Sequence, residues 1–171
     1  MPSPSAFAAT SALAVVLIAA VWDLRWRRIP NWLASPALGL AIIWHVAQGT
    51  WREAGLGLLL ATLIYLPLWL VGGRGGGDLK LMAALGAWLG PAAWIQIFVL
   101  TGVFGGLWAL ALIIVKRRVV ATFKNIAQIL RSLLTGRRPA HRLDSQEALS
   151  MPHAAIVALA LLAWLAVMRP L

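Results

Sequence analysis

The 171-residue sequence has no cysteine, which excludes disulfide bonds, thiolate nucleophiles and zinc sites built on cysteine. Acidic residues are also scarce: five Asp and Glu stand against fifteen Lys and Arg, so the net charge is +10. The three histidines, His45, His141 and His153, are scattered along the chain. Charged residues make up only 12% of the sequence, too few to cover the core of a soluble domain of this length.

Apolar residues, in contrast, make up 61% of the chain, a content typical of membrane proteins. A helix needs roughly 20 apolar residues to cross about 30 Å of hydrocarbon. The sequence therefore predicts an all-α, polytopic membrane protein, with one domain over residues 1–171 and a bundle of six transmembrane helices. The predicted spans are Ala6–Trp22, Trp32–Gln48, Gly55–Val71, Leu79–Leu89, Ala92–Val115 and Pro152–Met168. The pairs Gly86/Gly90 and Gly102/Gly106 have the spacing that allows close helix packing.

The positive charges predict the orientation of these spans. The arginines follow the first apolar run rather than precede it, which favours a first membrane helix over a cleaved signal, with both chain ends outside. With six crossings, all Lys and Arg except Arg52 and Arg169 fall on the inner side. The fourth span is short, about 16 Å of helix, and could be a re-entrant loop. A re-entrant loop would put the basic segment 116–142 outside, so a true crossing is predicted.

The basic loop at residues 116–150 is predicted to lie on the cytoplasmic side. Within it, "VVATFKNIAQILRSLLTG" has apolar residues at helical spacing with polar and basic residues between them. This pattern predicts an amphipathic helix on the inner membrane surface, where the basic loops would bind anionic lipids. Nucleic acid is not a predicted partner, because no recognisable binding motif accompanies the charge.

Two of the five acids stand at the edges of predicted spans. Asp23 ends the first span in "AAVWDLRWRRIPN", and Asp78 opens the fourth in "GGGDLKLMAALG". The orientation above puts both on the inner side, so a bundle can bring them together, and an acid at membrane depth is a candidate functional residue. Glu53, Asp144 and Glu147 lie in predicted loops and are interpreted as solvated charges.

Both acids also have simple structural interpretations. Asp78 could be an N-cap, and Asp23 could pair with Arg27 at a helix end. The glycines before Asp78 favour a functional role, because an N-cap does not need them and because glycine permits close backbone approach and a mobile loop. A phosphate-binding loop is disfavoured, since the Gly-Lys-Ser/Thr ending is missing and an acid would repel phosphate.

Two carboxylates that share a proton can hydrolyse a peptide bond without a metal or a covalent nucleophile. One carboxylate activates water, and the other protonates or hydrogen-bonds the carbonyl oxygen. No metal or cofactor is expected, and His153, which opens the last span on the inner side, could approach the pair. The alternative hypothesis is a non-enzymatic transporter or ion pathway with Asp23 and Asp78 as a cation site, although the spans contain few polar residues at mid-depth.

The segments "DLRWRRIPN" (23–31) and "GGGDLKLMAALGAWLG" (75–90) resemble the two signature segments of type IV prepilin peptidases, which are GxGD-type aspartic proteases. "MPHAAIVALA" (151–160) stands where this family has a proline-led segment that opens its last helix, with His153 in a position that is usually aromatic. The resemblance implies that Asp23 and Asp78 are the catalytic pair. Gly76 (or Gly75) through Asp78 would supply the GxGD element, with Gly77 in its variable place. The supporting or substrate-binding candidates are Gly75, Gly76, Gly77, Lys80, Arg28 and Asn31.

The resemblance further implies a leader peptidase of the bacterial inner membrane that cuts prepilins at the cytoplasmic face. Larger members have a cysteine-bearing cytoplasmic domain and also methylate the new N-terminus. This chain has no cysteine and no insertion after the first span, so it is similar to the short, peptidase-only form found with tight-adherence pili. Lys80 lies two residues after Asp78, as in the family, and would hold the charge of the pair or simply reach the membrane surface.

Overall fold

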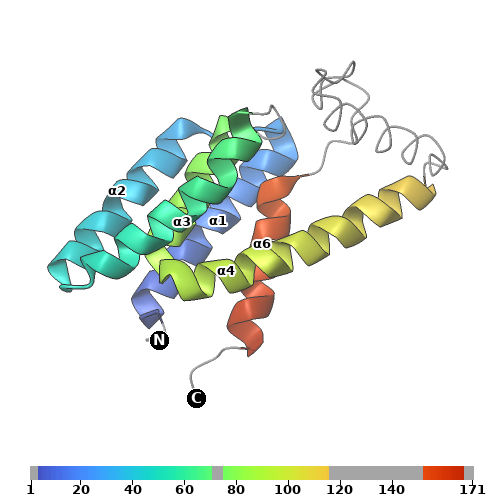
Figure 1. The fold of residues 1–171 in the computed structure, drawn as a ribbon. Helices are drawn as coiled ribbons and strands as arrows, with labels where there is room; N and C mark the ends of the chain where they lie inside the picture. Colours follow the sequence, from blue (N-terminus) through green and yellow to red (C-terminus); the bar gives the residue numbers. More distant parts are fainter. Residues whose placement is uncertain (1–3, 71–74, 116–151, 168–171) are drawn as a thin grey trace, which may run out of the picture.

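The computed structural model describes residues 4–70, 75–115 and 152–167. Over these residues the structure is all-helical and has five helices, which confirms the all-α part of the predicted fold class (Figure 1). The helices are α1 (Ala6–Trp26), α2 (Asn31–Ala47), α3 (Trp51–Leu70), α4 (Gly76–Val115) and α6 (His153–Val167). The amphipathic helix predicted within 116–150 lies outside the described residues.

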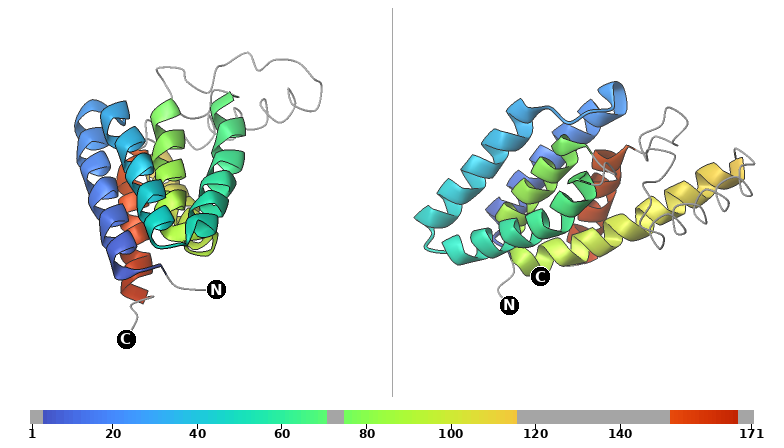
Figure 2. Two further views of the ribbon diagram at one scale, coloured as in Figure 1. Left: turned by 90° about the vertical axis from the view of Figure 1, so that its left-hand side faces the viewer. Right: turned by 45° about the horizontal axis from the view of Figure 1, so that its top comes forward.

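Helix α4 is divided by a sharp turn at Gly90, where φ is 75° and ψ is 173°. This backbone conformation favours glycine, and Pro91 cannot supply the N–H that would continue the preceding helix. The turn separates a first leg, residues 76–89, from a second leg, residues 91–115. The axis of the second leg points in a different direction from that of the first (Figures 1 and 2). The two legs correspond to the predicted fourth and fifth spans. The first leg begins three residues earlier than predicted, which lengthens it to about 21 Å.

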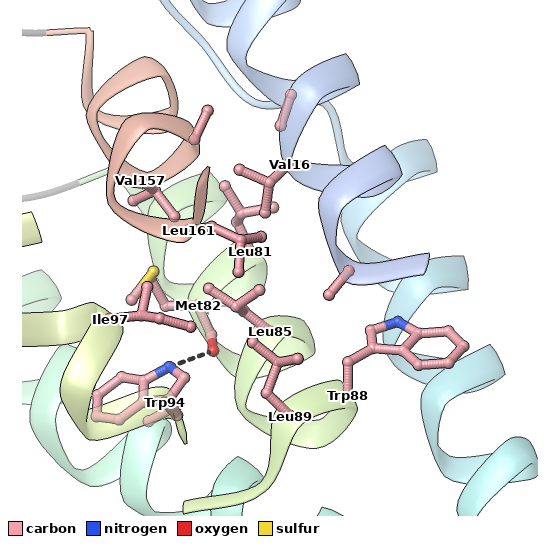
Figure 3. Packing of buried hydrophobic residues seen from close by; sticks show 14 of the residues in the cluster. Val16, Leu81, Met82, Leu85, Trp88, Leu89, Trp94, Ile97, Val157 and Leu161 are labelled. Carbon is pink, nitrogen blue, oxygen red and sulfur yellow. Dashed lines mark hydrogen bonds between the residues drawn. The ribbon is translucent and has the colours of Figure 1, made fainter. Parts of the chain in front are cut away.

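The first leg of α4 is the central helix of the bundle. Every residue from 81 to 90 is buried, and α4 contacts each of the other four described helices. Figure 3 shows Leu81 of this leg beside Val16 of α1 and Leu161 of α6. Across the turn, the Trp94 indole N–H donates a hydrogen bond to the Met82 carbonyl at 3.0 Å. The second leg is thereby tied to the first close to the turn.

Small residues set the distance between α3 and the first leg of α4. A Cβ atom added at Gly57 would overlap the carbonyl oxygen of Gly86, and one added at Gly86 would overlap the backbone of Gly57. The close packing predicted at Gly86 is therefore confirmed. At Gly102 and Gly106 no described atom lies within 4 Å of an added Cβ, so the same prediction is not confirmed there.

The described helices have the lengths and composition of membrane helices. Three are long and apolar enough to cross a membrane, namely α1, α3 and residues Gly76–Leu112 of α4. Helices α2 and α6 are apolar but shorter. Large apolar side chains such as Leu63, Val99 and Leu107 are exposed on the outside of the bundle. The six crossings and their orientation remain predictions.

Candidate active site

Five helix ends lie at one end of the bundle. Helices α1 and α3 end there, and α2, α4 and α6 begin there, as Figures 1 and 2 show. We call this the site end. Asp23 in the last turn of α1 and Asp78 in the first turn of α4 both lie at the site end. The sequence-based expectation that the two acids share one end of the bundle agrees with this arrangement.

Asp23 is a buried acid, with 6% of its surface exposed. Its Oδ2 atom accepts a hydrogen bond from the backbone N–H of Ala154, the second residue of α6, at 3.0 Å. The N–H groups in the first turn of a helix have no partner within the helix, so they are suited to bind a carboxylate. Arg27, which follows α1 in the left-handed conformation (φ 54°), donates its own N–H to the Asp23 carbonyl at 2.8 Å. The end of α1 and the start of α6 thus fix Asp23.

Asp78 is the third residue of α4 and is partly buried. Its backbone N–H donates to the Gly75 carbonyl at 3.1 Å, so Asp78 lies inside the first helical turn. The N-cap interpretation is therefore wrong: the residue before the helix is Gly75. A carboxylate in the first turn is favoured by the partial positive charge of the helix N-terminus.

The three glycines before Asp78 differ in the space around them. An added Cβ at Gly77 would lie 2.8 Å from the Ile29 carbonyl oxygen and 2.9 Å from the Ile29 Cβ. At Gly76 it would lie 3.4 Å from the indole nitrogen of Trp69, and at Gly75 none of the described atoms lies within 4 Å. The expectation that Gly77 is the variable position is thus corrected. Gly77 is the position where the connection between α1 and α2 leaves no room for a side chain.

Of the remaining supporting candidates, Lys80 and Asn31 meet directly. The Lys80 ammonium donates a hydrogen bond to the Asn31 Oδ1 at 2.9 Å, which ties the first turn of α4 to the start of α2. Arg28 lies in the short connection between α1 and α2 and is exposed. Glu53 is at the opposite end of the bundle, near Gly90. Asp144 and Glu147 lie outside the described residues.

A buried polar pair that the sequence did not reveal includes His153, the residue before Ala154, whose N–H binds Asp23. The Nε2 atom of His153 and the hydroxyl of Tyr65 are 3.3 Å apart, and both residues are buried. His153 was expected to be able to approach the site, whereas the sequence predicts no role for Tyr65. The available signal was that Tyr65 is the single tyrosine of the chain and lies in an apolar stretch near the end of α3 that belongs to the site end.

The arrangement offers two carboxylates at one end of an apolar bundle, one of them held by backbone. In the part of the chain that the structure describes, no three His, Asp or Glu residues are grouped as a metal site would require. The chemistry that these side chains themselves can perform is acid and base catalysis by the two carboxyl groups.

Comparison with known proteins identifies the family of the chain. The sequence profile of the type IV leader peptidase family matches residues 10–110, which include Asp23 and Asp78. A prepilin leader peptidase/N-methyltransferase of Burkholderia pseudomallei is 35% identical over 113 residues, which are 61% of this chain and 37% of the relative. The protein of the same name from Escherichia coli K12 is 31% identical over 118 residues, 63% of this chain and 52% of the relative.

A third relative of that name, from Xanthomonas campestris pv. campestris, is 32% identical over 103 residues, 52% of this chain and 36% of its own length. The chain therefore spans between about a third and about half of the length of these curated relatives. No solved structure gives a significant match.

Proposed function

The chain belongs to the type IV leader peptidase family, and from this premise we propose that it is a GxGD-type aspartic endopeptidase of the bacterial inner membrane. Its substrates are prepilins, from which it removes the leader peptide at the cytoplasmic face, and Asp23 and Asp78 are its catalytic residues. The observation that supports this most strongly is the position of Asp23. Asp23 is only 6% exposed among apolar helices, and its carboxylate accepts a hydrogen bond from the first turn of α6. It lies at the same end of the bundle as the second acid, Asp78.

In this mechanism the two carboxyl groups share one proton before the reaction. The ionised carboxylate takes a proton from a water molecule, which attacks the scissile carbonyl carbon, while the protonated carboxyl group donates a hydrogen bond to the carbonyl oxygen. The proton that the base has taken is then passed to the leaving nitrogen as the peptide bond breaks. The N–H of Ala154 fixes one oxygen of Asp23, so that its other oxygen keeps a constant direction.

Cleavage without methylation is part of the proposal. The curated relatives are named for both activities, but helix α2 begins only five residues after α1 ends, at Asn31 after Trp26. This connection has no room for an inserted domain. The chain also has no cysteine. We therefore assign it to the peptidase-only form associated with tight-adherence pili, with the basic loops on the cytoplasmic side in contact with anionic lipid.

The test is co-expression with candidate prepilins, in which loss of the leader gives faster migration in gel electrophoresis. Wild-type protein should process its prepilin, and Asp23→Asn and Asp78→Asn should each abolish processing while the protein stays inserted in the membrane. Glu53→Gln is the matched control, because Glu53 lies at the opposite bundle end, and it should process normally. Substantial processing by either Asn variant would refute the catalytic pair.

The same variants separate the peptidase from the ion-pathway hypothesis. A protein that leaves every prepilin intact, but whose proteoliposomes show cation flux that Asp23→Asn abolishes, would be a transporter instead. A peptidase should retain activity in detergent, where no ion gradient exists.

A further inference from the structure

The start of α6 is held at two adjacent residues. The His153 ring contacts the Tyr65 hydroxyl of α3, with Nε2 and the hydroxyl oxygen 3.3 Å apart. The next residue, Ala154, donates its backbone N–H to Asp23 of α1 at 3.0 Å. Because the two residues are consecutive in one helix turn, a displacement of the His153 side chain also displaces the N–H that Asp23 accepts.

Tyr65 is itself held in place by two aromatic rings of the second leg of α4. Its ring makes edge contacts with Trp94, at 6.3 Å between centroids and 76° between planes, and with Phe98, at 6.0 Å and 75°. Trp94 and Phe98 stack on each other at 5.3 Å and 8°. The position of the Tyr65 hydroxyl is therefore fixed by packing, and 2% of the residue is exposed.

We propose that Tyr65 and His153 are positioning residues of the active site, which hold the start of α6 so that the Ala154 N–H fixes the Asp23 carboxylate. They act on Asp23 through the backbone of α6 and need no contact with substrate. This inference rests on the proposed function and extends it to a helix that the family match, which ends at residue 110, does not reach. A tyrosine hydroxyl can donate to or accept from an imidazole nitrogen, so the contact holds in either neutral tautomer of His153.

Three variants test the proposal. Tyr65→Phe removes one oxygen atom and keeps the aromatic packing, and His153→Phe keeps a ring and removes both ring nitrogens, including the Nε2 that contacts Tyr65. Each should lower kcat about tenfold, the order expected from the loss of one hydrogen bond, and leave KM within about twofold. The double variant should be no slower than either single variant, because both changes remove the same contact.

The matched control is Trp164→Phe, which removes a hydrogen bond of α6 at the helix's other end. There the Trp164 indole N–H donates to Gln96 at 2.6 Å. This variant should lose some thermal stability and keep its kcat. A purely structural role of Tyr65 and His153 would give the same outcome as this control, so the difference between the variants separates positioning from general stability.

Amide hydrogen exchange provides a second measurement that does not depend on catalysis. Exchange at the first turn of α6 should be several-fold faster in Tyr65→Phe than in wild type and unchanged in Trp164→Phe. If wild type processes no prepilin but exchange still responds to Tyr65→Phe, the anchoring of α6 is supported and the proposed function fails. If kcat and exchange are both unchanged in Tyr65→Phe, or if the effects of the two single variants multiply in the double variant, the positioning role is refuted.

Discussion

Replacing Gly77 by alanine should disturb the catalytic site far more than it disturbs the fold. The added Cβ would lie 2.8 Å from the Ile29 carbonyl oxygen, a backbone atom that cannot rotate away. Ordinary contact begins at 3.4 Å, so the first turn of α4 must move by about 0.6 Å from the connection between α1 and α2. Asp78 is the next residue and moves with it.

Gly77→Ala should have a small effect on the free energy of unfolding and a larger effect on kcat. Overpacking of this kind costs about 1–3 kcal/mol, while alanine in place of glycine stabilises a helix by about 1 kcal/mol. The net loss of unfolding free energy should be about 0–2 kcal/mol. A displacement of about 1 Å at a reacting group can lower the rate about 100-fold, so a shift of roughly half that size should lower kcat roughly tenfold.

The assay is the rate of prepilin processing in detergent, normalised to the amount of folded enzyme, with thermal unfolding followed by tryptophan fluorescence. Gly55→Ala is the matched control, because no described atom lies within 4 Å of its added Cβ and it lies at the far end of α3 from the site, and it should process at the wild-type rate. Wild-type activity of Gly77→Ala would refute the reasoning. Equal losses in Gly55→Ala and Gly77→Ala would also refute it, because the loss would then not come from the contact with Ile29.

Two further predictions concern the bundle as a whole. Gly57→Ala should lower the free energy of unfolding by about 1–3 kcal/mol, because its Cβ would overlap the Gly86 carbonyl. Gly55→Ala, with no described atom within 4 Å of its added Cβ, should stabilise the helix slightly. Comparable effects of the two substitutions on unfolding in detergent would contradict the packing of α3 on α4. Single cysteines placed at Arg27 and Arg52, in a chain that has no other cysteine, should react with a membrane-impermeant reagent from the cytoplasmic and the outer side respectively. Labelling of both from one side would show that α2 does not cross.

Helix existence and helix ends could be predicted from the sequence because their signals are local. Apolar runs of the right length, the "GP" pair at Gly90–Pro91 and the polar connections specify where each helix begins and ends without reference to its neighbours. The bounds were still wrong by four residues at the end of α1 and at the start of α3, and by three residues at the start of α4. The error at α4 arose because the glycines before Asp78 were interpreted as a loop. In the structure Gly76 and Gly77 are already helical.

The contacts around the site could not be predicted from the same signals. A helix that is apolar on every side has no periodic pattern to indicate which face meets which neighbour. No sequence pattern therefore pairs Tyr65 with His153 or indicates that Gly57 packs on Gly86, while Gly102 and Gly106 have no neighbour within 4 Å among the described residues. These contacts depend on how the helices cross, which is a tertiary property.

The position of the two acids at one end of the bundle could be predicted without knowing any contact, because it follows from the number of helices between them. Two helices, α2 and α3, separate the end of α1 from the start of α4, so in an up-and-down bundle both points lie on the same side. Counting does not show how each acid is held. Asp78 begins the central helix, whose position is fixed from all sides, whereas Asp23 depends on one N–H of α6. The two carboxyl groups of the proposed pair are therefore positioned by different parts of the bundle, and changes in the connection to α2 and changes in α6 should act on different members of the pair.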